Sequence, residues 1–214
     1  CVMSSFTLNN GLYISITPRG SYYAVQDNAN DVTRNVLVKL LHRDDTPPLN
    51  DETLSDICEM DGDDASNHIH RMQTLGLISG QKEIEYAPEH NIEDILPDLL
   101  GALSDSKKVL LAEHSGLYLG ASGFPHEAAE ELAAISANLS EVYQRHKGLL
   151  HGNLRFNQQA WGLIDAAGNS EVGFWPLYVG FNQFALVIHG MPQLNRPAFK
   201  QLVWSLMRRY GATT

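Results

Sequence analysis

Hydrophobic and polar residues alternate with two different periods along the chain, and the switches between them outline a series of short elements. Residues 11–25 carry β-branched and aromatic side chains on both sides of Pro18-Arg19-Gly20, which predicts a β-hairpin with a tight turn. A helix follows and ends before Pro47 and Pro48, because proline cannot continue it. Its apolar residues recur at helical spacing: Val32, Val36, Leu37, Leu40 and Leu41.

Two further helices and two short strands complete the first pattern. A helix is predicted over residues 51–59, and a third runs from about Asp63, whose carboxylate is the expected cap, to Leu75 before Gly76. Residues 77–81 and 82–86 are predicted as two strands around a turn. Three helices and a terminal β-ribbon resemble a winged helix-turn-helix over residues 28–87. The residues of its recognition helix that would make contacts are Ser66, Asn67, His70 and Arg71.

Residues 87–91, Ala-Pro-Glu-His-Asn, separate two complete patterns. We therefore predict a hairpin and winged-helix-like domain over residues 1–87 and a second domain over residues 91–214. The second domain begins with an amphipathic helix over residues 92–103. Its other predicted elements are a hairpin of residues 108–113 and 117–121, a long helix over 125–149 with Pro125 in its first turn, strands over 158–164, 171–179 and 183–189, and a closing helix with an apolar stripe from Phe199 to Tyr210.

The order α-β-β-α-β-β-β-α and the segment Leu-Leu-Ala-Glu-His-Ser-Gly-Leu-Tyr-Leu-Gly-Ala-Ser-Gly at residues 110–123 together resemble the Roadblock/LC7 family. The resemblance covers about residues 91–211. One departure is His114-Ser115 in the hairpin turn, where the family usually places a small acidic residue. The resemblance implies an α+β fold, with a five-stranded antiparallel sheet in the second domain.

The same resemblance implies a homodimer. Family members pair the long helix and the strand that follows it, so that two sheets merge and a free strand edge is covered. Part of the long helix must also pack on its own sheet. The residues expected at the dimer interface are Leu132, Ile135, Leu139, Val142, Tyr143, Trp161 and Leu163.

The formal net charge of −10 belongs mainly to one segment, since residues 27–90 hold fourteen acidic and five basic side chains. A winged helix that reads DNA needs cations along the phosphates, yet the third helix has Arg71 as its sole fixed positive charge. This favours a winged helix used for protein contacts. The alternative is a DNA-binding transcriptional regulator that dimerises through the second domain, and a module that clasps a peptide with an added strand is a minor one.

Composition indicates a globular chain, with 43% hydrophobic and 19% charged residues and no apolar run of membrane-spanning length. The residues given begin without an export signal, so the cytoplasm is the expected location. Cys1 and Cys58 are the only cysteines and predict neither a disulfide framework nor a thiolate metal site. Cys1 is expected to be an arbitrary first residue of the given sequence. The lesser alternative is that it is the lipidated first residue of a processed lipoprotein.

Candidate chemistry is sparse. His68 and His70 lie two residues apart on a predicted helix, about 200° from each other, which excludes a shared metal ion there. The glycines of residues 116–123 lack the Gly-Lys-Ser/Thr ending of a phosphate loop, and a weak anion site at the helix amides after Gly120 is the only alternative. No nucleophile motif is present, and the adjacent carboxylates at 44–45 and 63–64 are expected to be solvated or to cap helices. We therefore predict no catalytic residue, cofactor or metal.

The function implied by the resemblance is that of a non-enzymatic adaptor or regulator, because family members act as scaffolds and as regulators of small GTPases. A small GTPase is accordingly the first partner to consider. Arg145, Lys147, Arg155 and Arg196 are candidate contacts, although exposed arginines and lysines commonly serve only solubility.

Overall fold

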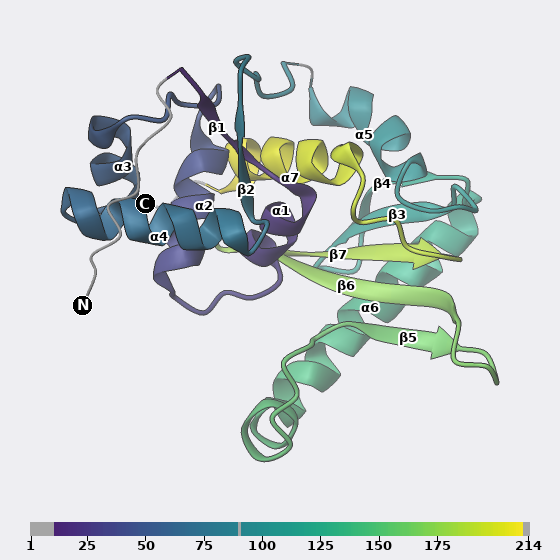
Figure 1. Cartoon of the computed structure of the whole chain (residues 1–214). Coiled ribbons are helices and arrows are strands. Elements are labelled where there is room, and N and C mark those ends of the chain that lie inside the picture. The colour runs from purple at the N-terminus through teal and green to yellow at the C-terminus, as the bar shows by residue number, and fades with distance from the viewer. Residues whose placement is uncertain (1–10, 90, 212–214) are drawn as a thin grey trace.

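The computed structural model describes residues 11–89 and 91–211 of the chain. Residues 91–211 form a five-stranded antiparallel sheet with helices on both faces (Figure 1). The strands are β3 (Val109–Glu113), β4 (Tyr118–Ser122), β5 (Trp161–Ile164), β6 (Ser170–Val179) and β7 (Asn182–His189), and the helices are α5 (Ile92–Gly101), α6 (His126–Lys147) and α7 (Pro197–Tyr210). The strand order is β4-β3-β7-β6-β5.

The predicted element order of this region is confirmed, with some shifted ends. The strand expected from residue 158 begins at Trp161, since the ladder with β6 starts at the pair of Trp161 and Phe174. The long helix ends at Lys147 and continues as a π-helical turn, η1 (Gly148–Asn153). Pro125 is the N-cap residue of α6 and lies just outside its first turn.

Alternation along the strands assigns each face of the sheet to its helices. In β3, Leu110 and Ala112 belong to the apolar cluster under α6. Val109 and Leu111 belong to the larger cluster on the opposite face, which is covered by α5 and α7. Successive strand residues point to opposite faces, so this central strand is buried on both sides.

The N-terminal part consists of helices and a small two-stranded sheet. Its elements are β1 (Tyr13–Ile16), α1 (Pro18–Val25), α2 (Val32–His42), α3 (Asp51–Cys58), α4 (Gly62–Thr74) and β2 (Ile78–Gln81). The three predicted helices over residues 32–41, 51–59 and 63–75 are present as α2, α3 and α4. Asp31 and Asn50 cap the first two, since each side chain accepts a hydrogen bond from the backbone amide three residues later.

The hairpin predicted over residues 11–25 is wrong. Only its first half is a strand, and residues 18–25 form helix α1. Thr17 is the N-cap of this helix and accepts a hydrogen bond from the Gly20 amide, while Pro18 occupies the first turn. A threonine followed by proline is a helix start, and this signal outweighs the interpretation of Pro18-Arg19-Gly20 as a turn. The minor peptide-clasping alternative loses the hairpin on which it rested.

The predicted ribbon of residues 77–81 and 82–86 is also wrong in its pairing. Strand β2 pairs with β1, with Ile16 opposite Ile78, and residues 82–86 contribute only an isolated bridge between Tyr86 and Asp45. Helix α4 begins at Gly62 with Asp61 as its N-cap residue, so Asp63 is not the cap. The winged-helix resemblance stays a prediction.

Two expectations concern the ends of the chain and the membrane. Cys1, the candidate lipidated residue, lies outside the described residues. Within residues 11–89 and 91–211, no helix combines the length and the apolar character that crossing a membrane requires.

Helix α7 joins the two halves of the chain. It lies between the sheet and the N-terminal helices α1 and α2, and Phe199, Leu202, Val203 and Leu206 are fully buried there (Figure 1). One apolar cluster runs from the N-terminal segment through α7 to the sheet. The division into residues 1–87 and 91–214 stays a prediction, but the two parts share a core.

A partly buried ion pair and a hydrogen bond to β1 link the N-terminal part to α7. The ammonium group of Lys200 lies 2.5 Å from the Glu85 carboxylate and 3.1 Å from the Ser15 hydroxyl, which itself donates to Glu85 at 2.9 Å. The side chain of Lys200 is 9% exposed and that of Glu85 is 32% exposed. Nearby, the Trp204 indole donates to the Arg43 carbonyl oxygen at 2.9 Å. The lysine and the tryptophan that α7 turns toward the N-terminal part therefore both have polar partners there.

Replacing Lys200 tests this junction. We expect Lys200→Met to lower the free energy of unfolding by about 2 kcal/mol, because it leaves Glu85 and Ser15 without their cation while water reaches only part of the carboxylate. Arg209→Met is the matched control on the same helix, since the Arg209–Glu93 pair is 47% exposed on both sides and should contribute under about 1 kcal/mol. Urea unfolding measures both, and equal losses would contradict the assignment.

Candidate functional site

Helix α6 carries two stripes of mainly apolar residues, and only one of them is buried against its own sheet. Ala129, Ala133, Ser136 and Tyr143 are buried against the sheet. About a quarter turn away lies a second stripe that faces the β5 side. Leu132 and Leu139 of this stripe are half-buried, and Ile135 and Val142 are 44% and 37% exposed. An apolar stripe in solvent is a candidate contact surface.

Strand β5 continues this surface at the edge of the sheet. All four of its residues are exposed, and its outer backbone edge pairs with no strand of the described chain. Trp161 lies opposite Phe174, and Leu163 lies opposite Val172. Because Phe174 is under α6, Trp161 and Leu163 project on the α6 side of the sheet. Free strand edges with apolar side chains readily pair with another strand.

Basic and apolar side chains also crowd the segment after α6. Figure 1 shows the last turns of α6 and η1 projecting away from the sheet. Leu149, Leu154 and Phe156 are each at least 50% exposed there. No acidic residue occurs between Glu141 and Asp165. This arm therefore extends the open surface and gives it a positive charge.

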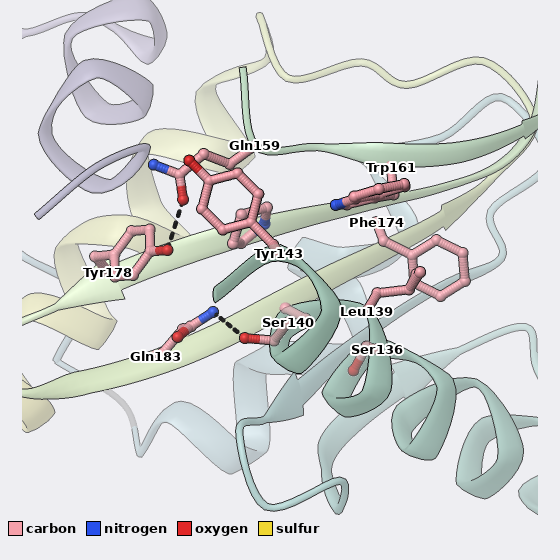
Figure 2. Close-up of a pocket in the computed structure, with 11 residues that line it drawn as sticks. Ser136, Leu139, Ser140, Tyr143, Gln159, Trp161, Phe174, Tyr178 and Gln183 are labelled. Atoms are coloured by element: carbon pink, nitrogen blue, oxygen red, sulfur yellow. Dashed lines mark hydrogen bonds between the residues drawn. The ribbon is translucent and has the colours of Figure 1, made fainter. Parts of the chain in front are cut away.

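A narrow groove lies between α6 and the strands β5 to β7 (Figure 2). Its polar groups pair with one another, since Tyr178 donates to the Gln159 side-chain oxygen at 2.6 Å and Gln183 donates to Ser140 at 2.8 Å. Its free interior volume is about 30 Å³. That admits a water or two, whereas pockets for small ligands are on the order of 300–1,000 Å³. The groove is too small for a cofactor.

Two tyrosines of the groove have raised pKa values. Burial, followed by the negative charge of Asp27, raises the pKa of Tyr143, and its buried hydroxyl has no hydrogen-bond partner. Burial, with further contributions from Tyr143 and Asp27, raises the pKa of Tyr178 to about 12. Both phenols are therefore protonated at neutral pH, which makes them unsuited to act as a base or a nucleophile.

The seven residues expected at a dimer interface lie close together on α6 and β5. Ile135, Val142, Trp161 and Leu163 are exposed, and Leu132 and Leu139 are half-buried. Tyr143 differs, because it is only 5% exposed and belongs to the groove of its own chain. The side chains of Arg145, Lys147, Arg155 and Arg196 are all exposed.

The predicted recognition-helix residues lie on α4, far from this surface. Asn67, His70 and Arg71 are exposed, and Ser66 is half-buried. Asp63 and Asp64 occupy the exposed first turn of the same helix. A nucleic acid bound to the outer face of α4 would therefore lie close to these two carboxylates.

Sequence reasoning missed one polar cluster at the opposite edge of the sheet. The Tyr118 hydroxyl lies 2.8 Å from Nδ1 of His126, and Nε2 of His126 lies 3.3 Å from the Glu130 carboxylate. The spacing of His126 and Glu130, four residues apart, was the available signal. The side chains of His126 and Glu130 are both more than 60% exposed. In the described part of the chain, no three His, Cys, Asp or Glu side chains are grouped to hold a metal ion.

Solved structures similar to this chain include the following two. One is a Roadblock/LC7 domain from Streptomyces avermitilis, with 15% sequence identity and a TM-score of 0.40 over 56% of this chain and 98% of the other. The second is Myxococcus xanthus MglB, with 16% identity and a TM-score of 0.39 over 57% of this chain and 98% of that protein. Both TM-scores lie below 0.5, so the strand order and helix placement of this chain remain the basis of its fold description. No known family model matches the sequence, and neither does any curated protein.

The two groove tyrosines make a matched pair of substitutions. We expect Tyr143→Phe to leave the free energy of unfolding unchanged or slightly higher, because the hydroxyl that it removes is buried without a partner. Tyr178→Phe removes the hydrogen bond to Gln159 and should cost about 1 kcal/mol. Chemical denaturation of both variants checks this, and a larger loss for Tyr143→Phe would mean that its hydroxyl has a partner after all.

Proposed function

We propose that this chain is a non-enzymatic adaptor or regulator that acts as a pair of identical copies joined through α6 and β5. One observation carries the proposal: the apolar stripe of α6 and the free edge of β5 form one exposed surface on the same side of the sheet. A second copy supplies the same stripe and the same edge. Two copies related by a two-fold axis can therefore bury this surface on both chains at once.

The partner of the paired chain is proposed to be a protein, with a small GTPase as the leading candidate from the Roadblock/LC7 resemblance. Two charged regions remain for such contacts. The segment of residues 27–90 carries the excess of acidic side chains. The last turn of α6 carries Arg145 and Lys147, and Arg155 follows η1. Complementary charge guides encounter and orientation in protein complexes.

Light scattering of the full chain tests the pairing. We expect twice the chain mass of 23.7 kDa at micromolar concentration. Ile135→Asp should shift the mass to that of one chain, because it places a carboxylate in the apolar seam. Val32→Asp is the matched control, since Val32 is also 44% exposed but lies on α2. A single-chain mass for the unmodified protein would remove the proposal.

The alternative function, a DNA-binding regulator, keeps one supporting feature, namely the exposed Asn67, His70 and Arg71 on α4. Its acidic first turn opposes that function, because Asp63 and Asp64 would approach the phosphates.

A gel shift at low salt distinguishes the two functions. We expect no sequence-dependent retention of duplex DNA, and no change between the unmodified chain and Arg71→Ala. Retention that Arg71→Ala abolishes, while the variant stays folded, would favour the transcriptional regulator instead.

A further inference from the structure

The arm that follows the sheet-packed part of α6 is covered by little of its own chain. It comprises the last turn of α6, the π-helical turn η1 and the residues that follow as far as Phe156, and it projects away from the sheet (Figure 1). Among the described elements, only α6 packs extensively against η1. Every residue from 144 to 158 except Leu150 is exposed. The arm is therefore a protruding surface that is open to a partner.

Local hydrogen bonds bring the apolar side chains of the arm together. The Leu154 amide donates to the Leu149 carbonyl oxygen, and the Phe156 amide donates to the Leu150 carbonyl oxygen, both at 2.9 Å. Arg155 has a left-handed backbone with a φ of 56°, which few non-glycine residues adopt. The chain thus folds back on itself here. Leu149, Leu154 and Phe156, each at least 50% exposed, are held close together at the end of the arm.

The charged side chains of the arm are all positive. Arg145, Lys147 and Arg155 are exposed, and no acidic residue occurs between Glu141 and Asp165. A surface that serves only solubility usually mixes both signs of charge. Exposed apolar side chains next to lysine and arginine are instead typical of segments that bind in the head-group region of an anionic membrane.

The acidity of the rest of the chain does not cancel this positive charge. Most of it belongs to residues 27–90, and the acidic helices α3 and α4 lie well apart from the arm in Figure 1. Exposed charges are screened over about 8 Å at physiological ionic strength. One carboxylate of that segment, Asp27, does act at the base of the arm, since its charge contributes to the raised pKa of Tyr143. The three cations of the arm still outnumber Asp27 and Glu141.

We infer that the arm binds the surface of an anionic lipid membrane. Its three exposed apolar side chains enter the boundary between head groups and acyl chains, and its three cations contact the lipid phosphates. The contact requires no membrane-spanning helix, because only the arm touches the lipid. This inference goes beyond the proposed function and leaves the acidic segment of residues 27–90 for the protein partner.

Sedimentation of the full chain with lipid vesicles tests the role of the cations. We expect vesicles of phosphatidylcholine and phosphatidylglycerol in equal parts to be bound roughly a hundredfold more tightly than vesicles of phosphatidylcholine alone, because each cation near an anionic surface contributes about fivefold. Replacing Arg145, Lys147 and Arg155 together by glutamine should remove most of this difference. Lys82→Gln, which removes an exposed cation of the N-terminal part, is the matched control and should change binding little.

Phe156→Ser tests the apolar part of the contact. It should weaken binding to the mixed vesicles roughly tenfold, because the 55% of this side chain that is exposed no longer enters the lipid. Phe181→Ser is the matched control, since Phe181 is 80% exposed but lies between β6 and β7. Both side chains are exposed, so neither change should unfold the chain, and circular dichroism checks that each variant is folded.

A polarity-sensitive fluorescent label shows whether the arm itself enters the lipid. The label is attached to Asn153→Cys or, as the control on α2, to Val32→Cys, each in a full chain that carries Cys1→Ser. Cys58 stays unlabelled, because it is buried and burial raises the pKa of its thiol to about 11. We expect the mixed vesicles to shift the emission to shorter wavelength at position 153 and not at position 32. Binding without a shift at position 153 would contradict insertion of the arm.

Other results would also overturn the inference. No binding to either kind of vesicle, or equal binding to both, would show that anionic lipid is not the partner. Binding that survives both arm substitutions would place the lipid contact elsewhere on the chain. A protein partner that requires the arm, found together with no vesicle binding, would assign the arm to that protein. Light scattering without lipid measures the proposed pairing of copies, so either proposal can fail while the other stands.

Discussion

Burial of α7 between the sheet and the N-terminal helices is the constraint on which the rest of the fold depends. The helix is buried on several sides, with Phe199, Leu202 and Leu206 inaccessible to solvent. One face of the sheet is therefore sealed by the chain itself. Any large contact with another molecule through the sheet is left to the α6 side and the two edge strands.

On the other face of the sheet, α6 alone does not cover all five strands. A single helix packs over β3 and β7 at the middle of the sheet, with few residues left to reach β5. The ten-residue strand β6 is paired on its outer side only at residues 170–174, and the groove with Tyr143 and Gln159 lies along the remainder. The outer part of this face thus keeps exposed apolar groups that a second surface can bury.

Sequence patterns predicted the parts of the fold that local rules determine. The long helix α6 and the order of the strands and helices over residues 91–211 follow from hydrophobic periodicity and turn signals, and the structure has them in that order. The hairpin at residues 11–25 failed because strand-like composition concealed a capped helix start at Thr17. The pairing of β2 failed because the competing partner, β1, lies more than sixty residues earlier in the chain. Contacts such as Tyr178 with Gln159 or Lys200 with Glu85 join distant residues and leave no local signal.

The location of the charges gives the proposed pair a consistent arrangement. The acidic helices α3 and α4 lie at the end of the molecule opposite β5 (Figure 1). Each chain has a net charge of −10, so two copies repel each other where their acidic parts come close. Pairing through α6 and β5 keeps the two acidic ends apart and so limits this repulsion.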